Sequence, residues 1–295
     1  MSLDLPNAVD GQRIALSSSA GPLSYYRDGA PDAAPLLLIH SINAAGSAYE
    51  MKPIYDHFRS RRAVYALDLP GFGFSERSDR PYDARLMTDA VHAMTEVIRQ
   101  AHGDAPIDAI ALSLGSEFLA RAAAEMPERY RTLGLISPTG VDSRAPYEKP
   151  PLSNRGMPWL YATFRNPLWS KPFFDLLSSR KSIRFFLKKT FGSPNIDESL
   201  LDYDYLTTHQ PGARHAPYRF VSGYLFSTDI TRIYDQLKMP VWVTHGIRGD
   251  FVDYTGLDRY RLQPNWTIEK MPTGALPHFE LREDFLRRYE AFLAR

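Results

Sequence analysis

Ile107-Asp108-Ala109-Ile110-Ala111-Leu112-Ser113-Leu114-Gly115-Ser116 is the stretch of sequence that decides the fold. Its first six residues form a short apolar run typical of a buried strand. Residues 117–124 then show the apolar spacing of a helix. A serine on the sharp turn between strand and helix presents its hydroxyl above the sheet, over the positive end of the helix. Ser113 is therefore a candidate nucleophile, although serine at such a turn is also a common helix N-cap.

Short apolar runs of this kind alternate with longer helical patterns along most of the chain. Several runs are too continuously apolar for a half-exposed sheet, which indicates buried parallel strands between covering helices. The predicted fold class is α/β, with a mostly parallel central sheet flanked by helices. The predicted strands are 36–39, 63–67, 107–112, 132–136, 240–244 and 266–270, and the predicted helices are 47–58, 84–101, 115–124 and 280–293.

The alternation stops between residues 140 and 235. This part opens with a proline-rich connector and continues as short helical patterns dense in aromatic residues. We interpret residues 140–235 as a helical lid inserted into a core made of residues 1–139 and 236–295. A helical subdomain with a core of its own is compatible with that interpretation, because a lid also needs a core. We expect Trp159, Phe173 and Phe186 to be among the walls of a substrate pocket beneath the lid.

Composition excludes several classes of function. The chain has 295 residues, a net charge of +1 and no cysteine. It therefore has no global field to attract nucleic acid, and disulfides, thiolate metal sites and thiol nucleophiles are excluded. We find no secretory signal pattern and no apolar stretch long enough to span a bilayer, so we expect a cytoplasmic protein without a membrane span.

Three further motifs resemble the α/β-hydrolase family. The run 36–40 looks like the family's strand ending in His-Gly, with Ser41 in place of the glycine. Asp-Leu-Pro-Gly-Phe-Gly-Phe-Ser at 68–75 matches the family's D-x-P-G-x-G-x-S turn. Residues 240–253 resemble the strand and loop that carry its acid, and the serine, acid, histidine order also fits. The resemblance implies the α/β-hydrolase fold and a serine nucleophile, with Ala111 replacing the first glycine of the G-x-S-x-G elbow.

The resemblance implies that Asp250 is the acid that holds a catalytic histidine in the correct tautomer. Asp250 lies one residue later after Gly246 than the commonest spacing in the family. Asp253 is therefore a rival for this role, and Asp142, after the preceding strand, is a more remote one. Each of the three could instead be a carboxylate that caps a loop or a helix.

The histidine position departs from the family pattern. The family's G-H-x-x-x-x-E tail aligns with Gly274-Ala275-Leu276-Pro277-His278-Phe279-Glu280, which puts Ala275 in the histidine position. His278 is one helical turn further along if the segment is helical. Three explanations stay open: His278 serves as the base, Ala275 is a deliberate substitution, or the triad has been lost naturally. We expect Ala275 in the site with His278 pointing away slightly more than the reverse.

By the same resemblance, the backbone N–H groups of Leu114 and Ile42 form the oxyanion hole. Asn43 could add a side-chain donor, although asparagine is also a common turn residue. We expect His40 to support this loop rather than to react. If the glycine replaced by Ser41 needs a positive φ angle, serine distorts the loop.

Other signals are weaker. We predict no cofactor and no metal, because no phosphate loop, G-x-G-x-x-G motif or cluster with metal-ligand spacing occurs. The run 180–189 is basic and amphipathic, which would suit a membrane surface or an acidic partner. We interpret it as a solvated lid helix, because the whole chain is nearly neutral.

The function expected from these features is a cofactor-independent serine hydrolase that acts on a small, largely apolar ester or related carbonyl compound. A ligand-binding or regulatory protein that has lost turnover is the alternative, favoured by Ala275 and Ser41. A lyase on the same scaffold comes third. The partner in each case is a small molecule, and the sequence does not determine the oligomeric state.

Overall fold

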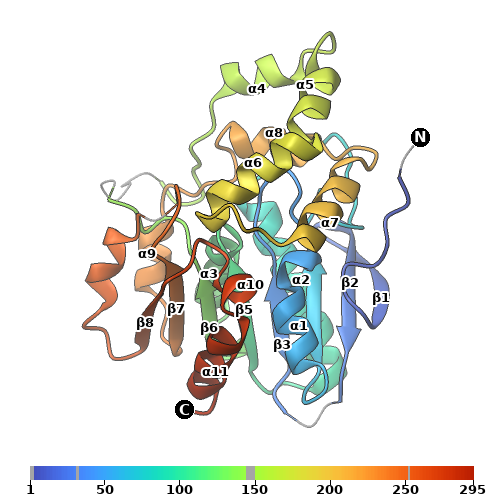
Figure 1. The fold of residues 1–295 in the computed structure, drawn as a ribbon. Coiled ribbons are helices and arrows are strands. Elements are labelled where there is room, and N and C mark those ends of the chain that lie inside the picture. The colour runs from blue at the N-terminus through green and yellow to red at the C-terminus, as the bar shows by residue number, and fades with distance from the viewer. Residues whose placement is uncertain (1–2, 31–32, 144–149, 252) are drawn as a thin grey trace.

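The protein, seen here in a computed structural model, is built on one eight-stranded sheet (Figure 1). The structure describes residues 3–30, 33–143, 150–251 and 253–295. The strand order is β1-β2-β4-β3-β5-β6-β7-β8, with β2 antiparallel to both β1 and β4 and all other pairs parallel. The strands are β1 (Gln12–Ser18), β2 (Gly21–Asp28), β3 (Leu36–Ile39), β4 (Val64–Asp68), β5 (Ile107–Leu112), β6 (Tyr130–Ile136), β7 (Val241–Gly246) and β8 (Trp266–Met271).

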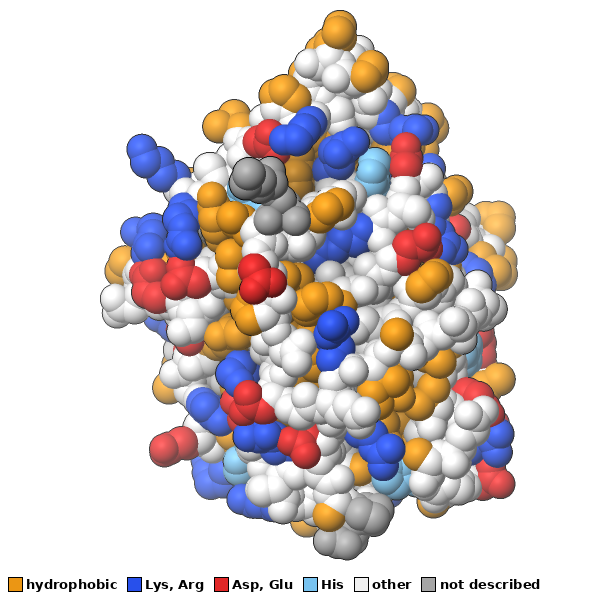
Figure 2. Space-filling view, turned by 90° about the vertical axis from the view of Figure 1, so that its right-hand side faces the viewer, with side chains coloured by type: hydrophobic (Ala, Val, Ile, Leu, Met, Phe, Trp, Pro, Cys, Tyr) orange, Lys and Arg blue, Asp and Glu red, His pale blue; other side chains and the backbone are white. Residues whose placement is uncertain are grey.

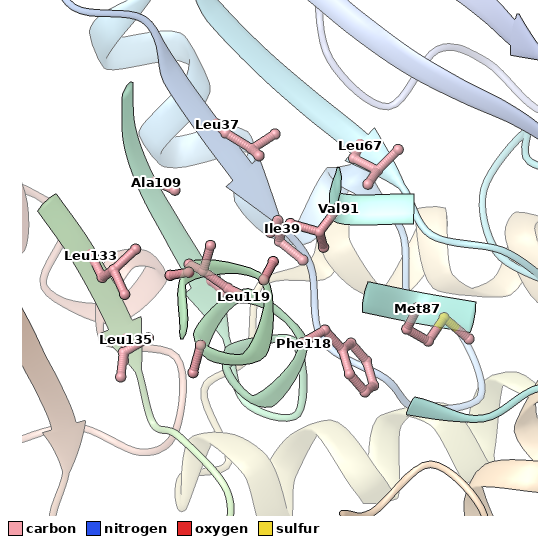
Figure 3. Close-up of a cluster of buried hydrophobic side chains, with 14 of the residues drawn as sticks. Leu37, Ile39, Leu67, Met87, Val91, Ala109, Phe118, Leu119, Leu133 and Leu135 are labelled. Carbon is pink, nitrogen blue, oxygen red and sulfur yellow. The ribbon is translucent and has the colours of Figure 1, made fainter. Parts of the chain in front are cut away.

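Helices cover both faces of this sheet. The strands β3, β4, β5 and β7 are therefore buried along their whole length. On one face, leucines of the strands pack against Met87 and Val91 of one helix and Phe118 and Leu119 of the next (Figure 3). On the other face, helices near the two ends of the chain enclose a second core. The first face is covered by α2 (Ala84–His102), α3 (Gly115–Glu125) and α9 (Ile230–Asp235), and the second by α1 (Lys52–Phe58), α10 (Pro277–Glu280) and α11 (Arg282–Leu293).

A run of helices lies between β6 and β7, and Figure 1 shows most of it above the sheet, beyond the carboxyl ends of the parallel strands. These inserted helices have a small aromatic core of their own. The guanidinium of Arg77 ties them to the sheet by donating to Thr207 O at 2.7 Å. Besides α9, they are α4 (Pro158–Arg165), α5 (Ser170–Leu177), α6 (Arg180–Phe191), α7 (Glu198–Thr208) and α8 (His215–Val221). The described structure also contains short 3₁₀ helices: η1 (Ala48–Met51), η2 (Pro127–Arg129) and η3 (Thr255–Tyr260).

The predicted fold class is confirmed, and all six predicted strands are present within a few residues of their expected bounds. The β1–β2 hairpin was not predicted. The residues of β1 are all exposed or half-buried, as expected of an edge strand, so that strand lacks the continuous apolar run that marks the others.

Candidate active site

Ser113 lies at the turn between β5 and α3, as the sequence predicts. Its φ angle is +52°, a left-handed conformation that is costly for a residue with a side chain. The turn is held from outside, because Ser113 N–H donates to Ile136 O at 2.8 Å in the neighbouring strand. Gly115 permits it: a Cβ at that position would lie 2.4 Å from His40 O. The side chain of Ser113 is half-buried.

The two predicted oxyanion donors have no competing partner. Among the described residues, neither the N–H of Leu114 nor that of Ile42 takes part in a hydrogen bond. Both residues are buried. A buried N–H without a partner is expensive, which is acceptable where a ligand oxygen will accept the bond. The oxyanion role of these two groups stays a prediction.

His40 supports the loop after β3. Leu69 N–H donates to its Nε2 at 2.9 Å, so Nδ1 carries the proton and donates to Ser41 O at 2.6 Å. Burial lowers the pKa of His40 to about 4, even though the bond to Ser41 opposes the shift. His40 is therefore a neutral connector between this loop and the turn after β4, and it has no free nitrogen for proton transfer.

Asn43 is not available as a side-chain donor to the site. Its Nδ2 donates to Ser41 Oγ at 2.9 Å and to Glu50 Oε1 at 2.6 Å, while its Oδ1 accepts from Ala45 N–H at 2.6 Å. The alternative that Asn43 contributes directly to the oxyanion hole is wrong for this geometry. Ser41 does not need a positive φ, and its hydroxyl also bonds to Glu50, so it does not distort the loop.

Glu50 is the residue of this loop that sequence reasoning missed. Ser47-Ala48-Tyr49-Glu50 has the spacing of a capping box, and that pattern suggests an ordinary helix start. Ser47 makes no side-chain cap bond, and the buried carboxylate of Glu50 instead accepts from Ser41 N–H at 2.7 Å. Burial raises the pKa of Glu50, against the bonds from Ser41 and Asn43. Glu50 thus organises the loop that carries the Ile42 N–H.

His278 is not in position to act as the base. It is fully buried, and its Nε2 donates to the carbonyl of Glu50 at 2.8 Å. Its ring packs on Phe279 and Phe285, and the described residues show no hydrogen bond between it and Ser113 or Asp250. The alternative in which His278 serves as the base would require those bonds, and this geometry contradicts it, because Pro277 starts a short helix that carries His278 into the core. The other geometry, with His278 pointing away, is the one observed.

The burial of His278 leads to a pH-dependent stability prediction. Burial lowers its pKa to about 4, although the bond to Glu50 O opposes the shift, and an unfolded histidine has a pKa of about 6.5. Between pH 6.5 and 4 the unfolded chain binds a proton that the folded protein cannot, so stability is lost as the pH falls. We expect the destabilisation caused by His278→Leu to be largest at pH 7 and to shrink by up to about 3 kcal/mol at pH 4. Urea unfolding at pH 7, 5.5 and 4 measures this difference, and a pH-independent difference would contradict it.

The predicted acid is engaged elsewhere. Asp250 is more than half exposed and forms an ion pair with Lys189 of α6. The rival Asp253 accepts from Ser143 N–H at 3.0 Å and from Thr255 Oγ at 2.7 Å, bonds that lower its pKa. Asp253 is therefore a loop-capping carboxylate. Asp142 lies in the loop after β6 and is half-buried.

Two of the three predicted pocket walls face outward. Trp159 is 68% exposed and Phe186 is 49% exposed, so both face outward. Phe173 stacks on Phe164 inside the small core of the inserted helices. The exposure of Trp159 and Phe186 contradicts their expected place as walls beneath the lid, whereas the wall role of Phe173 stays a prediction. A cavity of about 200 Å³ lies instead between α4, α5 and the start of α8.

The described ranges of the chain also bear on metal binding and on membrane spanning. No group of three or more His, Asp or Glu side chains there could hold a metal ion. None of the helices in these ranges combines the length and apolar character needed to cross a bilayer.

A family model described as alpha/beta hydrolase fold matches residues 34–216, more than half of the chain. The chain belongs to the alpha/beta hydrolase fold family. It is 28% identical over 113 residues to the (lyso)-N-acylphosphatidylethanolamine lipase of Mus musculus, and the aligned part spans 38% of this chain but 32% of that protein.

Solved structures of other proteins share the fold of this α/β hydrolase. A probable hydrolytic enzyme from Pseudomonas aeruginosa superposes with a TM-score of 0.71 at 19% identity, over 98% of this chain and 96% of the other. A carboxylesterase from Bacillus subtilis gives 0.69 at 18% identity, over 96% and 92%. At identities this low, the TM-scores establish a common fold and nothing further.

In this α/β hydrolase, the end of α6 fills the region where the acid and histidine loops meet. Thr190 O accepts from Ala275 N–H at 2.8 Å. Gly249 stands at the commonest acid position, three residues after Gly246, and its φ is +93°. A Cβ at Gly249 would lie 2.6 Å from Lys189 O. An aspartate at 249 would therefore be strained and would displace α6. The nearest carboxylate in sequence, Asp250, is more than half exposed.

Proposed function

We propose that this α/β hydrolase is a serine hydrolase of small, largely apolar carboxylic esters, with Ser113 as the nucleophile. The observation that carries the proposal is the strained turn at Ser113. A left-handed serine costs on the order of 1–3 kcal/mol and persists only where the surroundings impose it. The unpaired N–H groups of Leu114 and Ile42 support the same role, because they are the donors a tetrahedral intermediate would need.

The reaction has two balanced steps. Ser113 Oγ bonds to the ester carbonyl carbon as the alcohol leaves with a proton, and water then cleaves the acyl-serine to release the acid and restore the hydroxyl. No histidine is hydrogen-bonded to Ser113 in the described structure, so solvent must take the serine proton. Oxyanion stabilisation and binding alone leave roughly 10³–10⁴-fold catalysis over water. We therefore propose a slow esterase.

We further propose that residues 140–235 act as a lid over this site, with residues 1–139 and 236–295 as the core. Support comes from the place of the inserted helices beyond the carboxyl ends of the parallel strands (Figure 1). This edge is where ligands bind in open α/β sheets. The similar proteins described as a lipase and a carboxylesterase agree with an ester as substrate.

A second function is favoured by one observation. Because His278 bonds to Glu50 O and Ala275 has no imidazole, the scaffold could bind a carbonyl ligand without turning it over. In this alternative the protein is a ligand-binding or regulatory module, and Ser113 only donates a hydrogen bond to the ligand.

Labelling with a fluorophosphonate, combined with hydrolysis of p-nitrophenyl butyrate, separates the two functions. We expect slow labelling and slow hydrolysis by the native chain, and the loss of both in Ser113→Ala. Ser116→Ala is the matched control, because Ser116 is buried in the same helix and donates to Ala111 O at 3.3 Å. If the native protein neither labels nor hydrolyses the ester but still binds it, the binding module is correct. Equal activity in Ser113→Ala would exclude Ser113 as the nucleophile.

A further inference from the structure

Large apolar side chains are concentrated on the outer surface of the inserted helices. Of the fifteen exposed large hydrophobic residues in the described structure, eight lie between positions 152 and 186. This segment is about one eighth of the chain, so the concentration is not the scatter found on ordinary surfaces. The eight are Leu152, Met157, Trp159, Leu168, Trp169, Leu176, Phe185 and Phe186.

Six of these eight residues belong to a projecting part of the molecule, which we call the tip and define as residues 158–191, helices α4 to α6. Figure 1 shows α4 and α5 at the end of the molecule furthest from the sheet. Tyr161 and Phe174 point inward and form a small core with Tyr218 of α8. The inner faces of α4 and α5 are therefore already covered, and the exposed side chains belong to their free faces.

The tip is also the most basic part of the chain. Residues 158–191 contain seven Lys and Arg and one Asp, a net charge of +6, whereas the whole chain carries +1. Some of these cations pair with acidic residues, such as Arg184 with Glu198 of α7. Others, Lys181 and Lys188, have no ion pair among the described residues. The near-neutral total therefore hides a local positive charge on the tip.

The cavity at the base of the tip has the same sign of charge. Its volume is about 200 Å³, and Arg165, Lys171 and Arg214 line it. Asp79 is the one carboxylate among the lining residues, and it accepts from Arg165 at 2.9 Å. The cations outnumber the carboxylate, so the cavity favours an anionic group such as a phosphate.

We propose that the tip docks on the surface of an anionic phospholipid bilayer. Its Trp, Leu and Phe side chains enter the boundary between headgroups and acyl chains, and its Lys and Arg side chains contact the phosphates. Figure 2 shows hydrophobic side chains at the uppermost point of the molecule and, further down, Lys and Arg side chains with some Asp and Glu among them. An apolar end followed by a mainly basic zone matches the order of acyl chain and phosphate in a lipid leaflet. The docking does not depend on catalysis by Ser113.

Sedimentation with vesicles tests the proposal. Phosphatidylcholine vesicles with and without 30% phosphatidylglycerol are mixed with the full-length protein in 0.1 M and 0.5 M NaCl. We expect binding to the anionic vesicles, at least tenfold weaker for Leu168→Ser/Leu176→Ser, whose side chains are 81% and 68% exposed. Lys181→Ala/Lys188→Ala and 0.5 M NaCl should each weaken binding severalfold. Leu262→Ser is the matched control, because Leu262 is 96% exposed on the core, and it should bind like the native chain.

Several outcomes would overturn the docking. They are no sedimentation with either vesicle, equal binding of the double leucine variant, or equal binding to vesicles without phosphatidylglycerol. A dimer in solution that Leu168→Ser/Leu176→Ser dissociates, without vesicle binding, would show that the tip joins two copies of the chain. The measurement is repeated with Ser113→Ala, which should bind like the native protein. Loss of esterase activity and loss of docking are thereby distinguished.

Discussion

Ala275→His is expected to raise the rate of ester hydrolysis by about two orders of magnitude. A positioned general base contributes roughly 10²–10⁴-fold, and we expect the low end because the predicted acid, Asp250, is not free to orient the new imidazole. Asp250 is paired with Lys189, and Gly249 at the usual acid position has no side chain. The backbone at the substituted residue is well held, since Ala275 N–H donates to Thr190 O and Ala275 O accepts from Ser137 Oγ at 2.9 Å.

The measurement is kcat/KM for p-nitrophenyl butyrate between pH 6 and 8. The gain should follow the deprotonation of an imidazole and should vanish in Ser113→Ala/Ala275→His, because the base acts through the serine. Lys189→Ala/Ala275→His should gain further, since it releases Asp250 from its ion pair. If Ala275→His folds like the native chain but neither labels at Ser113 nor hydrolyses esters faster, the binding function is favoured.

The sequence predicts the sheet well because its strands are continuous apolar runs, as in β3 and β5, whose side chains are buried on both faces. The elbow was predictable for a related reason. A small residue such as Gly115 and a serine directly after a buried strand leave one compact arrangement, and the observed φ of Ser113 agrees with it. Local sequence carries this information, because the elements concerned are adjacent in the chain.

The partners of the acid and histidine loops could not be predicted in the same way. Lys189 lies 61 residues before Asp250, and the contact depends on where α6 ends against the sheet. His278 carried an ambiguous signal, since its distance from Ala275 has meaning only once the start of α10 at Pro277 is known. Trp159 and Phe186 were misplaced because an aromatic helix shows the same spacing whether it faces a pocket or a solvent-exposed surface.

Asp229→Ala is expected to destabilise the protein by about 3–5 kcal/mol, because it would leave the guanidinium of Arg121 buried without its partner. Arg121 and Asp229 are 4% and 3% exposed, and two bonds of 2.5 and 3.2 Å join them. Urea unfolding measures the loss. Asp202→Ala, which removes an exposed ion pair with Arg180, is the control and should cost less than about 1 kcal/mol.

The same ion pair links the helix that carries Ser113 at its start to the inserted helices. Arg121 lies on α3, whereas Asp229 precedes α9 and also accepts from Leu152 N–H at 3.1 Å. Arg121→Met/Asp229→Leu removes both charges and should be more stable than Asp229→Ala, since no unpaired ion stays buried. Limited proteolysis should then cut Asp229→Ala first within residues 150–235, and the double variant more slowly. Equal stability of Asp229→Ala and Asp202→Ala would show that Arg121 finds another partner and that the inserted helices are held to α3 by apolar packing alone.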